Sequence, residues 1–347
     1  MVLSSLQIGL AALGAAVLAG VALHGAWVSR RSSPRQAAPE PGGAAPSVLD
    51  ERIEPSLDAA ALELAQFPLP QPEKKPGLDA LLDAIATIAL DGPVSGDAAL
   101  AALPPTRRAG SKPFAVEGLN EENATWELPV AGRRYGLFQA GVQLANRAGA
   151  LNEIEYSEFV MKTQAFSDAI GGTPDFPDML DEVARARELD QFASAHDAQL
   201  ELLLRARSTA WSPGYVQQNA ARLGFVAGAI PGRMVIPAAG PGLPPTLGLG
   251  FDTQAALAED PTQAAIRELV LSLDVPQVAR SEQPFDRMRE LALGLAEAMD
   301  GVVTDDRGTA LSLLALDQIG ADLSHLYDTL EQRDLAAGSA LARRLFS

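Results

Sequence analysis

The hydrophobic pattern of the chain begins with an uninterrupted apolar run. No charged side chain occurs between Leu6 and Val28. At the rise of an α-helix these roughly 23 residues span about 35 Å, and the hydrocarbon core of a bilayer is about 30 Å thick. Apolar residues surround this helix on every side, which argues against an ordinary amphipathic helix buried in a soluble domain. The pattern predicts a transmembrane helix over residues 6–28.

The charges that flank the apolar run predict its orientation. Arg30, Arg31 and Arg35 follow it, whereas residues 1–5 carry no basic side chain. Basic residues beside a membrane helix favour the cytoplasmic side, so the short N-terminus is expected outside and the rest of the chain inside. A cleaved signal peptide is the alternative, but there the basic residues precede the apolar segment.

Proline dominates the next stretch, residues 29–76. Prolines occur at positions 34, 39, 41, 46, 55, 68, 70, 72 and 76. Proline at this density interrupts both helices and sheet ladders. The stretch is therefore expected to be an extended cytoplasmic linker.

Periodic patterns return in residues 77–195. The apolar run over residues 78–90 fits either a helix or a buried strand, and its period does not separate the two. Short helices are expected over residues 95–103 and 178–192. Alternating or extended segments predict strands at 114–116, 125–128, 134–144 and 154–161, the last reading IEYSEFVM.

Residues 196–347 give a clearer pattern. Helices are predicted at 212–223, where Ser212 and Pro213 form a favourable start, at 284–299 and at 316–330. Strands are predicted at 198–206, 234–236, 247–251, 269–275 and 302–303. This order is typical of an α+β fold, an antiparallel sheet with helices on one face. Residues 77–195 show a similar but fainter rhythm, which raises the hypothesis of a duplicated unit, with chance similarity as the alternative.

Composition excludes some classes of function. The net charge is −17, from 44 acidic and 27 basic side chains, so the surface repels the phosphate backbone of nucleic acids. The chain has no cysteine, which removes disulfides, thiol catalysis and cysteine-based metal sites. We therefore expect no nucleic-acid partner.

Candidate catalytic residues are few. The three histidines, His24, His196 and His325, form no zinc-binding spacing, and no phosphate-binding glycine loop occurs. The adjacent carboxylates Asp305 and Asp306 are better explained by a solvated turn than by a metal or acid–base pair. We expect no enzyme activity, no cofactor and no metal.

An apolar surface is the more promising feature. Leu247, Leu249 and Phe251 alternate with glycines on one predicted strand, and Val270 lies on a later one. One interpretation places these four residues in a groove that accepts a partner's apolar peptide. The alternative interpretation buries the three residues of the first strand against the helices as core.

Several segments together resemble the ZipA family of bacterial cell-division proteins. They are LHGAWVSRR at 23–31, the proline-rich linker, GFVAG at 224–228, the helix from Phe285, and DGVVTDDRG at 300–308. The resemblance covers residues 1 to about 35 and about 197 to about 335. It leaves residues 77–195 and the tail at 338–347 without a counterpart, and the linker is short for the family.

The resemblance implies a location and a function. It implies a single-pass protein of the cell inner membrane, with residues 1–5 in the periplasm. It also implies that a sheet face at 196–347 binds the C-terminal peptide of the tubulin-like protein FtsZ and tethers FtsZ polymers at the septum. Glu201 and Arg205 make this face more polar than the family's. The alternative function is a membrane-anchored enzyme or envelope-stress factor with an unrecognised active site.

Overall fold

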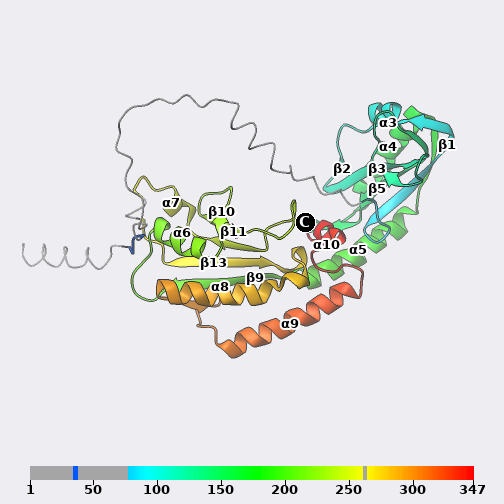
Figure 1. The fold of residues 1–347 in the computed structure, drawn as a ribbon. Coiled ribbons are helices and arrows are strands. Elements are labelled where there is room, and N and C mark those ends of the chain that lie inside the picture. Colours follow the sequence, from blue (N-terminus) through cyan, green and yellow to red (C-terminus); the bar gives the residue numbers. More distant parts are fainter. Residues whose placement is uncertain (1–33, 38–76, 261–263) are drawn as a thin grey trace, which may run out of the picture. The chain divides into compact units, whose positions relative to one another are not determined.

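The computed structural model describes residues 34–37, 77–260 and 264–347, which form two compact units (Figure 1). Unit 1 contains residues 34–37, 199–273 and 283–320 of these, and unit 2 contains 77–198, 274–282 and 321–347. The predicted membrane helix at 6–28 and most of the predicted linker lie outside the described residues. Within the described ranges, no helix is both long and apolar enough for a membrane span.

Unit 1 is built on a six-stranded sheet with the strand order β10-β11-β12-β13-β9-β14. In chain order the strands are β9 (Gln199–Ala206), β10 (Val226–Ala227), β11 (Arg233–Ile236), β12 (Leu247–Gly250), β13 (Glu268–Asp274) and β14 (Gly301–Thr304). The helices are α6 (Pro213–Arg222), the short α7 (Thr253–Ala256), α8 (Pro284–Met299) and the start of α9 (Leu313–Glu331). The predicted strands and helices of this region are thus present.

The core of unit 1 lies between the sheet and helix α8. The inward strand residues alternate with outward ones, as a period of two requires, and include Leu202, Leu204, Leu269 and Leu271. Helix α8 buries the residues predicted from its period of three and four, which are Phe285, Met288, Leu291, Leu295 and Met299. Helix α6 begins as predicted, since Ser212 Oγ accepts a hydrogen bond from the Tyr215 N–H (3.2 Å).

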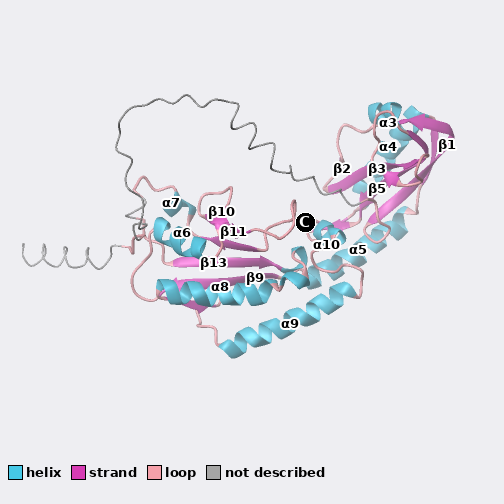
Figure 2. Ribbon diagram, viewed as in Figure 1, coloured by secondary structure: helices cyan, strands magenta, loops and turns pink. Residues whose placement is uncertain are grey.

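Unit 2 is built on a second antiparallel sheet, which contains the labelled strands β1, β2, β3 and β5 (Figure 2). Its strand order is β2-β3-β5-β1-β8, and β4 pairs with β3. Its strands are β1 (Asp83–Ser95), β2 (Arg108–Ala109), β3 (Lys112–Asn120), β4 (Trp126–Glu127), β5 (Arg134–Gln143) and β8 (Gly172–Asp175). Strands β6 (Ala145–Asn146) and β7 (Gly149–Ala150) form a separate hairpin. The helices are α3 (Gly96–Ala102), α4 (Glu153–Ile170), α5 (Met179–His196), α10 (Ala340–Leu345) and the 3-10 turns at Val275–Gln277 and Arg280–Glu282.

The two units share the order of their main elements. Each begins with a strand and a helix, continues through several strands, and ends with helix, strand and helix. In both six-stranded sheets the first strand lies between the last two strands of that sheet. In unit 1, β9 lies between β13 and β14, and in unit 2, β1 lies between β5 and β8. The two sheets differ by one strand. In unit 1, β12 lies between β11 and β13, whereas in unit 2, β3 pairs directly with β5.

One predicted strand was wrong. Residues 154–161 belong to helix α4, in which Tyr156, Phe159 and Phe166 are buried at helical spacing. The helix begins at a capping box in which Asn152 and Glu155 each bond the other's backbone N–H, a local signal that outweighs the short alternation. The run at 78–90, which was open between helix and strand, contributes its second half to β1.

Candidate functional site

Strand β12 separates the predicted groove residues onto two faces of the unit 1 sheet. Leu249 pairs with Leu271 on β13, and Leu247 and Leu249 are fully or almost fully buried among the core residues. Gly248 and Gly250 point to the opposite, outer face, because successive residues of a strand alternate. Leu247 and Leu249 therefore lie in the core, the alternative interpretation that the sequence left open.

Val270 lies on the outer face. It pairs with Gly250 across β12 and β13 and is half-buried. Phe251 follows β12 and is only 8% exposed, yet it is one of the residues that line the same hollow as Val270. The structure thus brings Phe251 and Val270 together and excludes Leu247 and Leu249 from that surface.

The hollow is a shallow open depression of about 360 Å³ on unit 1. The residues that line it come from β11, the end of β12, and β13 with the segment before it: Arg233, Gly250, Phe251, Asp252, Ala265, Ile266, Arg267, Glu268 and Val270. Gly250 forms part of its floor, and a Cβ there would collide with the Arg233 guanidinium. The hollow thus combines apolar side chains with two cations, Arg233 and Arg267, and two carboxylates, Asp252 and Glu268.

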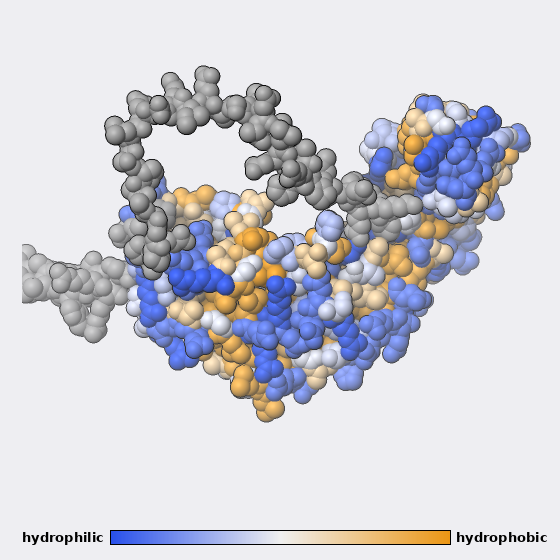
Figure 3. All heavy atoms as spheres, in the orientation of Figure 1, coloured by the Kyte–Doolittle hydropathy of each residue, from blue (hydrophilic) through white to orange (hydrophobic). Residues whose placement is uncertain are grey.

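Charged residues border this apolar surface. Arg205 Nε on β9 donates to Glu268 Oε2 at 2.7 Å, which neutralises both groups at one side of the hollow. Among the described residues, Arg233 forms no ion pair. Glu201 is exposed. Figure 3 shows the general pattern, in which charged and polar side chains surround smaller apolar patches.

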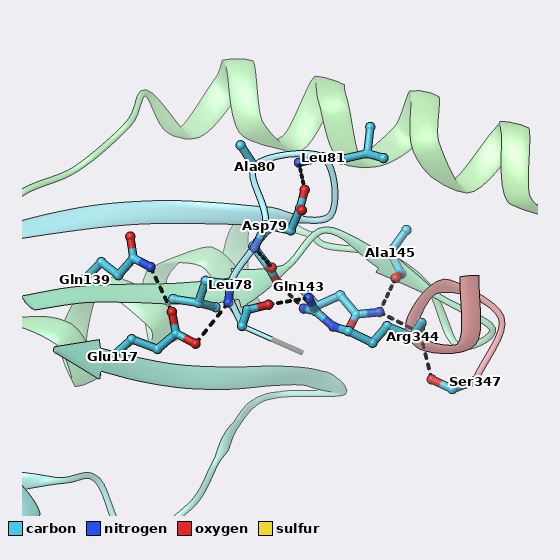
Figure 4. A network of polar contacts seen from close by, with 12 residues as sticks. Leu78, Asp79, Ala80, Leu81, Glu117, Gln139, Gln143, Ala145, Arg344 and Ser347 are labelled. Atoms are coloured by element: carbon cyan, nitrogen blue, oxygen red, sulfur yellow. Dashed lines mark hydrogen bonds and ion pairs between the residues drawn. The ribbon is translucent and has the colours of Figure 1, made fainter. Parts of the chain in front are cut away.

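On the unit 2 sheet, the Leu78 side chain covers part of the face that corresponds to the hollow. Gly141 on β5 lies on the same face as Gln139, two residues earlier, and a Cβ at Gly141 would collide with Leu78. Glu117 holds this segment in place, because its Oε1 accepts from the Leu78 N–H (3.1 Å) and its Oε2 accepts from Gln139 Nε2 (2.9 Å; Figure 4). Leu78 therefore covers the glycine that would leave this face open.

A polar network beside Leu78 belongs to the interior of unit 2 (Figure 4). The Asp83 carboxylate is almost fully buried and accepts from Arg344 Nη2 and from the Asp79 N–H (2.8 Å). Gln143 Nε2 donates to the carbonyls of Ala145 (2.7 Å) and Arg344 (2.9 Å). Burial raises the pKa of Asp83, and the ion pair with Arg344 acts in the opposite direction. These contacts have a structural role.

The described parts of the chain hold no candidate metal centre. No group of three or more His, Asp or Glu side chains converges there. Asp305 lies in a turn, where its Oδ1 accepts from the N–H groups of Arg307 (3.0 Å) and Thr309 (2.7 Å). That is the predicted solvated turn.

Sequence reasoning missed Arg233 and Leu78 as surface-defining residues. The signal for Arg233 was its place in the alternating strand RMVI, where Arg233 and Val235 share one side and Met234 and Ile236 the other. The pairing of Arg233 with Gly250 depends on the strand register, which the sequence does not give.

A family comparison matches the region that contains β13, α8 and part of the hollow's lining. Residues 257–321 match the family model described as "ZipA, C-terminal FtsZ-binding domain". The predicted ZipA resemblance is confirmed over these residues. The ZipA C-terminal domain is a non-enzymatic binding domain, which agrees with the expected absence of a catalytic centre. A search of curated proteins found no match to the chain.

Proposed function

We propose that this protein is a cell-division adaptor that binds the C-terminal peptide of FtsZ and holds FtsZ polymers at the inner membrane. The observation that carries the proposal is the ZipA family match over residues 257–321, which include β13, α8 and most of the hollow's wall. Two further features support it: a depression on a sheet face that is lined by apolar and charged side chains, and a predicted membrane helix at 6–28.

The outer sheet face suits an apolar peptide. Val270, Val235 and Phe251 supply apolar surface, and Arg233, whose guanidinium lies over Gly250, supplies a cation that a peptide carboxylate can bind. Peptides that bind such faces gain affinity from a few apolar anchors in a hollow. We assign peptide contact to Val270 and Phe251, which line the hollow, and we no longer assign it to Leu247 or Leu249, which are core residues.

Unit 2 is proposed to be a degenerate copy of unit 1 without a working site. The shared order of elements supports a duplication. Leu78 and the Glu117–Gln139 pair occupy the face that corresponds to the hollow of unit 1. Titration of the full chain with FtsZ tail peptide is expected to give one peptide per chain, and two peptides per chain would contradict the single site.

The membrane assignment has its own test. The basic residues that follow the apolar run predict a cytoplasmic location for both units. Protease added to spheroplasts is expected to leave residues 77–347 intact and to digest them only after the inner membrane is permeabilised. Digestion from outside in intact spheroplasts would contradict the predicted topology.

Localisation separates the adaptor from the alternative enzyme or stress factor. A fluorescent fusion of the full chain is expected to form a ring at mid-cell that disappears when FtsZ is depleted. Uniform membrane fluorescence in dividing cells would contradict the adaptor function. As a matched control, the Val270→Ser fusion is expected to remain at the membrane but to lose most of the ring.

A further inference from the structure

A short segment that follows the predicted membrane helix is part of the fold of unit 1. Arg35 and Trp211 form a parallel β-bridge: the Arg35 N–H donates to the Ala210 carbonyl (2.7 Å), and the Ser212 N–H donates to the Arg35 carbonyl (2.9 Å). Trp211 also pairs with Ile266 through two backbone hydrogen bonds of 2.8 Å. Residues 34–37 thus extend the backbone pairing of unit 1.

The Arg35 side chain binds the C-terminus of helix α8. Its Nη1 donates to the Met299 carbonyl (3.2 Å), and its Nη2 donates to Asp300 Oδ2 (2.9 Å). The last carbonyls of a helix have no partner within the helix, and the helix dipole favours a cation at this end. Arg35 therefore satisfies two acceptors at the end of the main core helix of unit 1.

Side chains from unit 1 complete this docking site. Trp211 is fully buried, and its Nε1 donates to the same Met299 carbonyl (2.8 Å). Ser208 Oγ donates to the same Asp300 oxygen as Arg35 (2.9 Å). Pro34 is buried against the unit. Backbone hydrogen bonds, an ion pair and the burial of Pro34 together hold the segment on unit 1. A surface ion pair alone would add little stability.

We propose that residues 34–37 are a strap that fixes unit 1 directly beneath the membrane. The proposal rests on the membrane part of the proposed function. Arg35 lies roughly seven residues after Val28, and a fully extended chain of that length reaches about 25 Å. Without the strap, the chain would first enter the described fold at Gly77, roughly fifty residues after Val28, with a reach of up to about 170 Å.

The strap changes the role of the proline-rich stretch. Residues 38–76 then connect unit 1 to unit 2, instead of separating the membrane from the peptide-binding unit. The strap also opposes electrostatic repulsion, because a chain of net charge −17 is repelled from the anionic lipid surface. The unit that carries the hollow is thereby kept within a few nanometres of the bilayer.

A disulfide trap tests the docking. A Cβ at Gly214 would lie 3.8 Å from the Ala37 Cβ, which is within the usual range for a disulfide. The chain has no native cysteine, so a Cys pair at these positions is the only possible bridge. In the full chain in native membranes, Ala37→Cys with Gly214→Cys is expected to lose most maleimide labelling after mild oxidation.

The matched control moves one cysteine along the same helix. Arg222 is exposed on α6, about 12 Å from Gly214 at the helical rise. Ala37→Cys with Arg222→Cys is expected to keep both thiols reactive. If the Gly214 pair also stays reactive, the strap is overturned while the membrane anchor is untouched. If the pair closes but carbonate extracts the chain from membranes, the membrane position fails and the proposed anchor fails with it.

Energy transfer tests the distance to the membrane. A donor at Arg222→Cys and an acceptor lipid in vesicles that hold the full chain report on the position of unit 1. Arg35→Pro removes both the bridging N–H and the guanidinium, and is expected to reduce transfer at least threefold. Ala44→Pro, in the proline-rich stretch outside the strap, is expected to retain it. Equal transfer in Arg35→Pro and the parent chain would overturn the proposal.

Discussion

Val270 on β13 pairs with Gly250 on β12, so an apolar side chain stands next to a position that has none. The step between them forms part of the hollow on the outer face of unit 1. One residue further along the strand, Leu249 pairs with Leu271 on the opposite face and is completely buried. Neighbouring positions on the same two strands therefore belong to two different surfaces, the outer face and the core. A substitution on the outer face should change peptide affinity, and one in the core should change the free energy of unfolding.

Val270→Ser is expected to weaken binding with little effect on stability. The half-buried valine offers apolar contact to a peptide, and its loss should reduce affinity for the FtsZ tail peptide about tenfold, or ~1.4 kcal/mol. Isothermal titration of the full chain measures the affinity. Unchanged affinity would remove Val270 from the site.

Leu249→Ala is the matched core variant. Its side chain is completely buried, so the free energy of unfolding is expected to fall by about 2–5 kcal/mol. Thermal unfolding followed by circular dichroism measures this loss. Below the melting temperature the affinity for the peptide should stay close to that of the parent chain. A loss of affinity without a loss of stability would return Leu249 to the binding surface.

Arg233→Gln should change the salt dependence of binding. The guanidinium lies over Gly250 in the hollow and has no ion-pair partner among the described residues, so it is available for a carboxylate of the peptide. The variant is expected to lose about threefold to tenfold in affinity at low salt, and less at high salt, where the charge is screened. Arg222→Gln, on exposed α6, is the control and should bind like the parent chain.

Arg344→Gln should destabilise unit 2 in a pH-dependent way. The substitution leaves the buried Asp83 carboxylate without its cation, and the expected cost near neutral pH is about 3–5 kcal/mol. Burial already raises the pKa of Asp83 in the folded chain, and loss of Arg344 raises it further. A raised carboxyl pKa contributes stability below the unfolded pKa and loses it as pH rises through the folded pKa.

The difference between Arg344→Gln and the parent chain should therefore shrink as pH falls from 8 towards 5. Urea unfolding at several pH values measures it. Asp83→Asn in the Arg344→Gln background removes the charge and should restore part of the stability at pH 8. A cost that is independent of pH, and that Asp83→Asn does not relieve, would contradict this account of the pair.

Local signals explain what the sequence predicted well. Helix α8 has identical predicted and observed bounds, because Pro284 begins it and the apolar stripe from Phe285 continues it. Gly301 was the predicted stop, and in the structure the residue before it, Asp300, ends the helix in a left-handed conformation. The order of the family segments likewise located the ZipA-like region. These features depend on residues close together in the chain.

Which residues line the groove depends on the pairing between strands that are distant in the chain, and the sequence does not give that pairing. The alternation of Leu247, Leu249 and Phe251 fits burial as well as exposure, and only the register with β13 places Val270 on the other face. The docking of Arg35 on α8 joins residues separated by 265 positions. No local pattern predicts such a contact, because arginines after a membrane helix are also explained by orientation alone.

In the proposed function, Leu78 limits each adaptor molecule to one peptide. With Leu78 over Gly141, the proposed adaptor is monovalent towards a polymer that displays many identical tails. A monovalent contact can be released one subunit at a time, whereas two linked sites would gain avidity and bridge neighbouring filaments. A single leucine thus favours a membrane attachment that exchanges as the polymer turns over, and a chain with this face uncovered would act as a crosslinker.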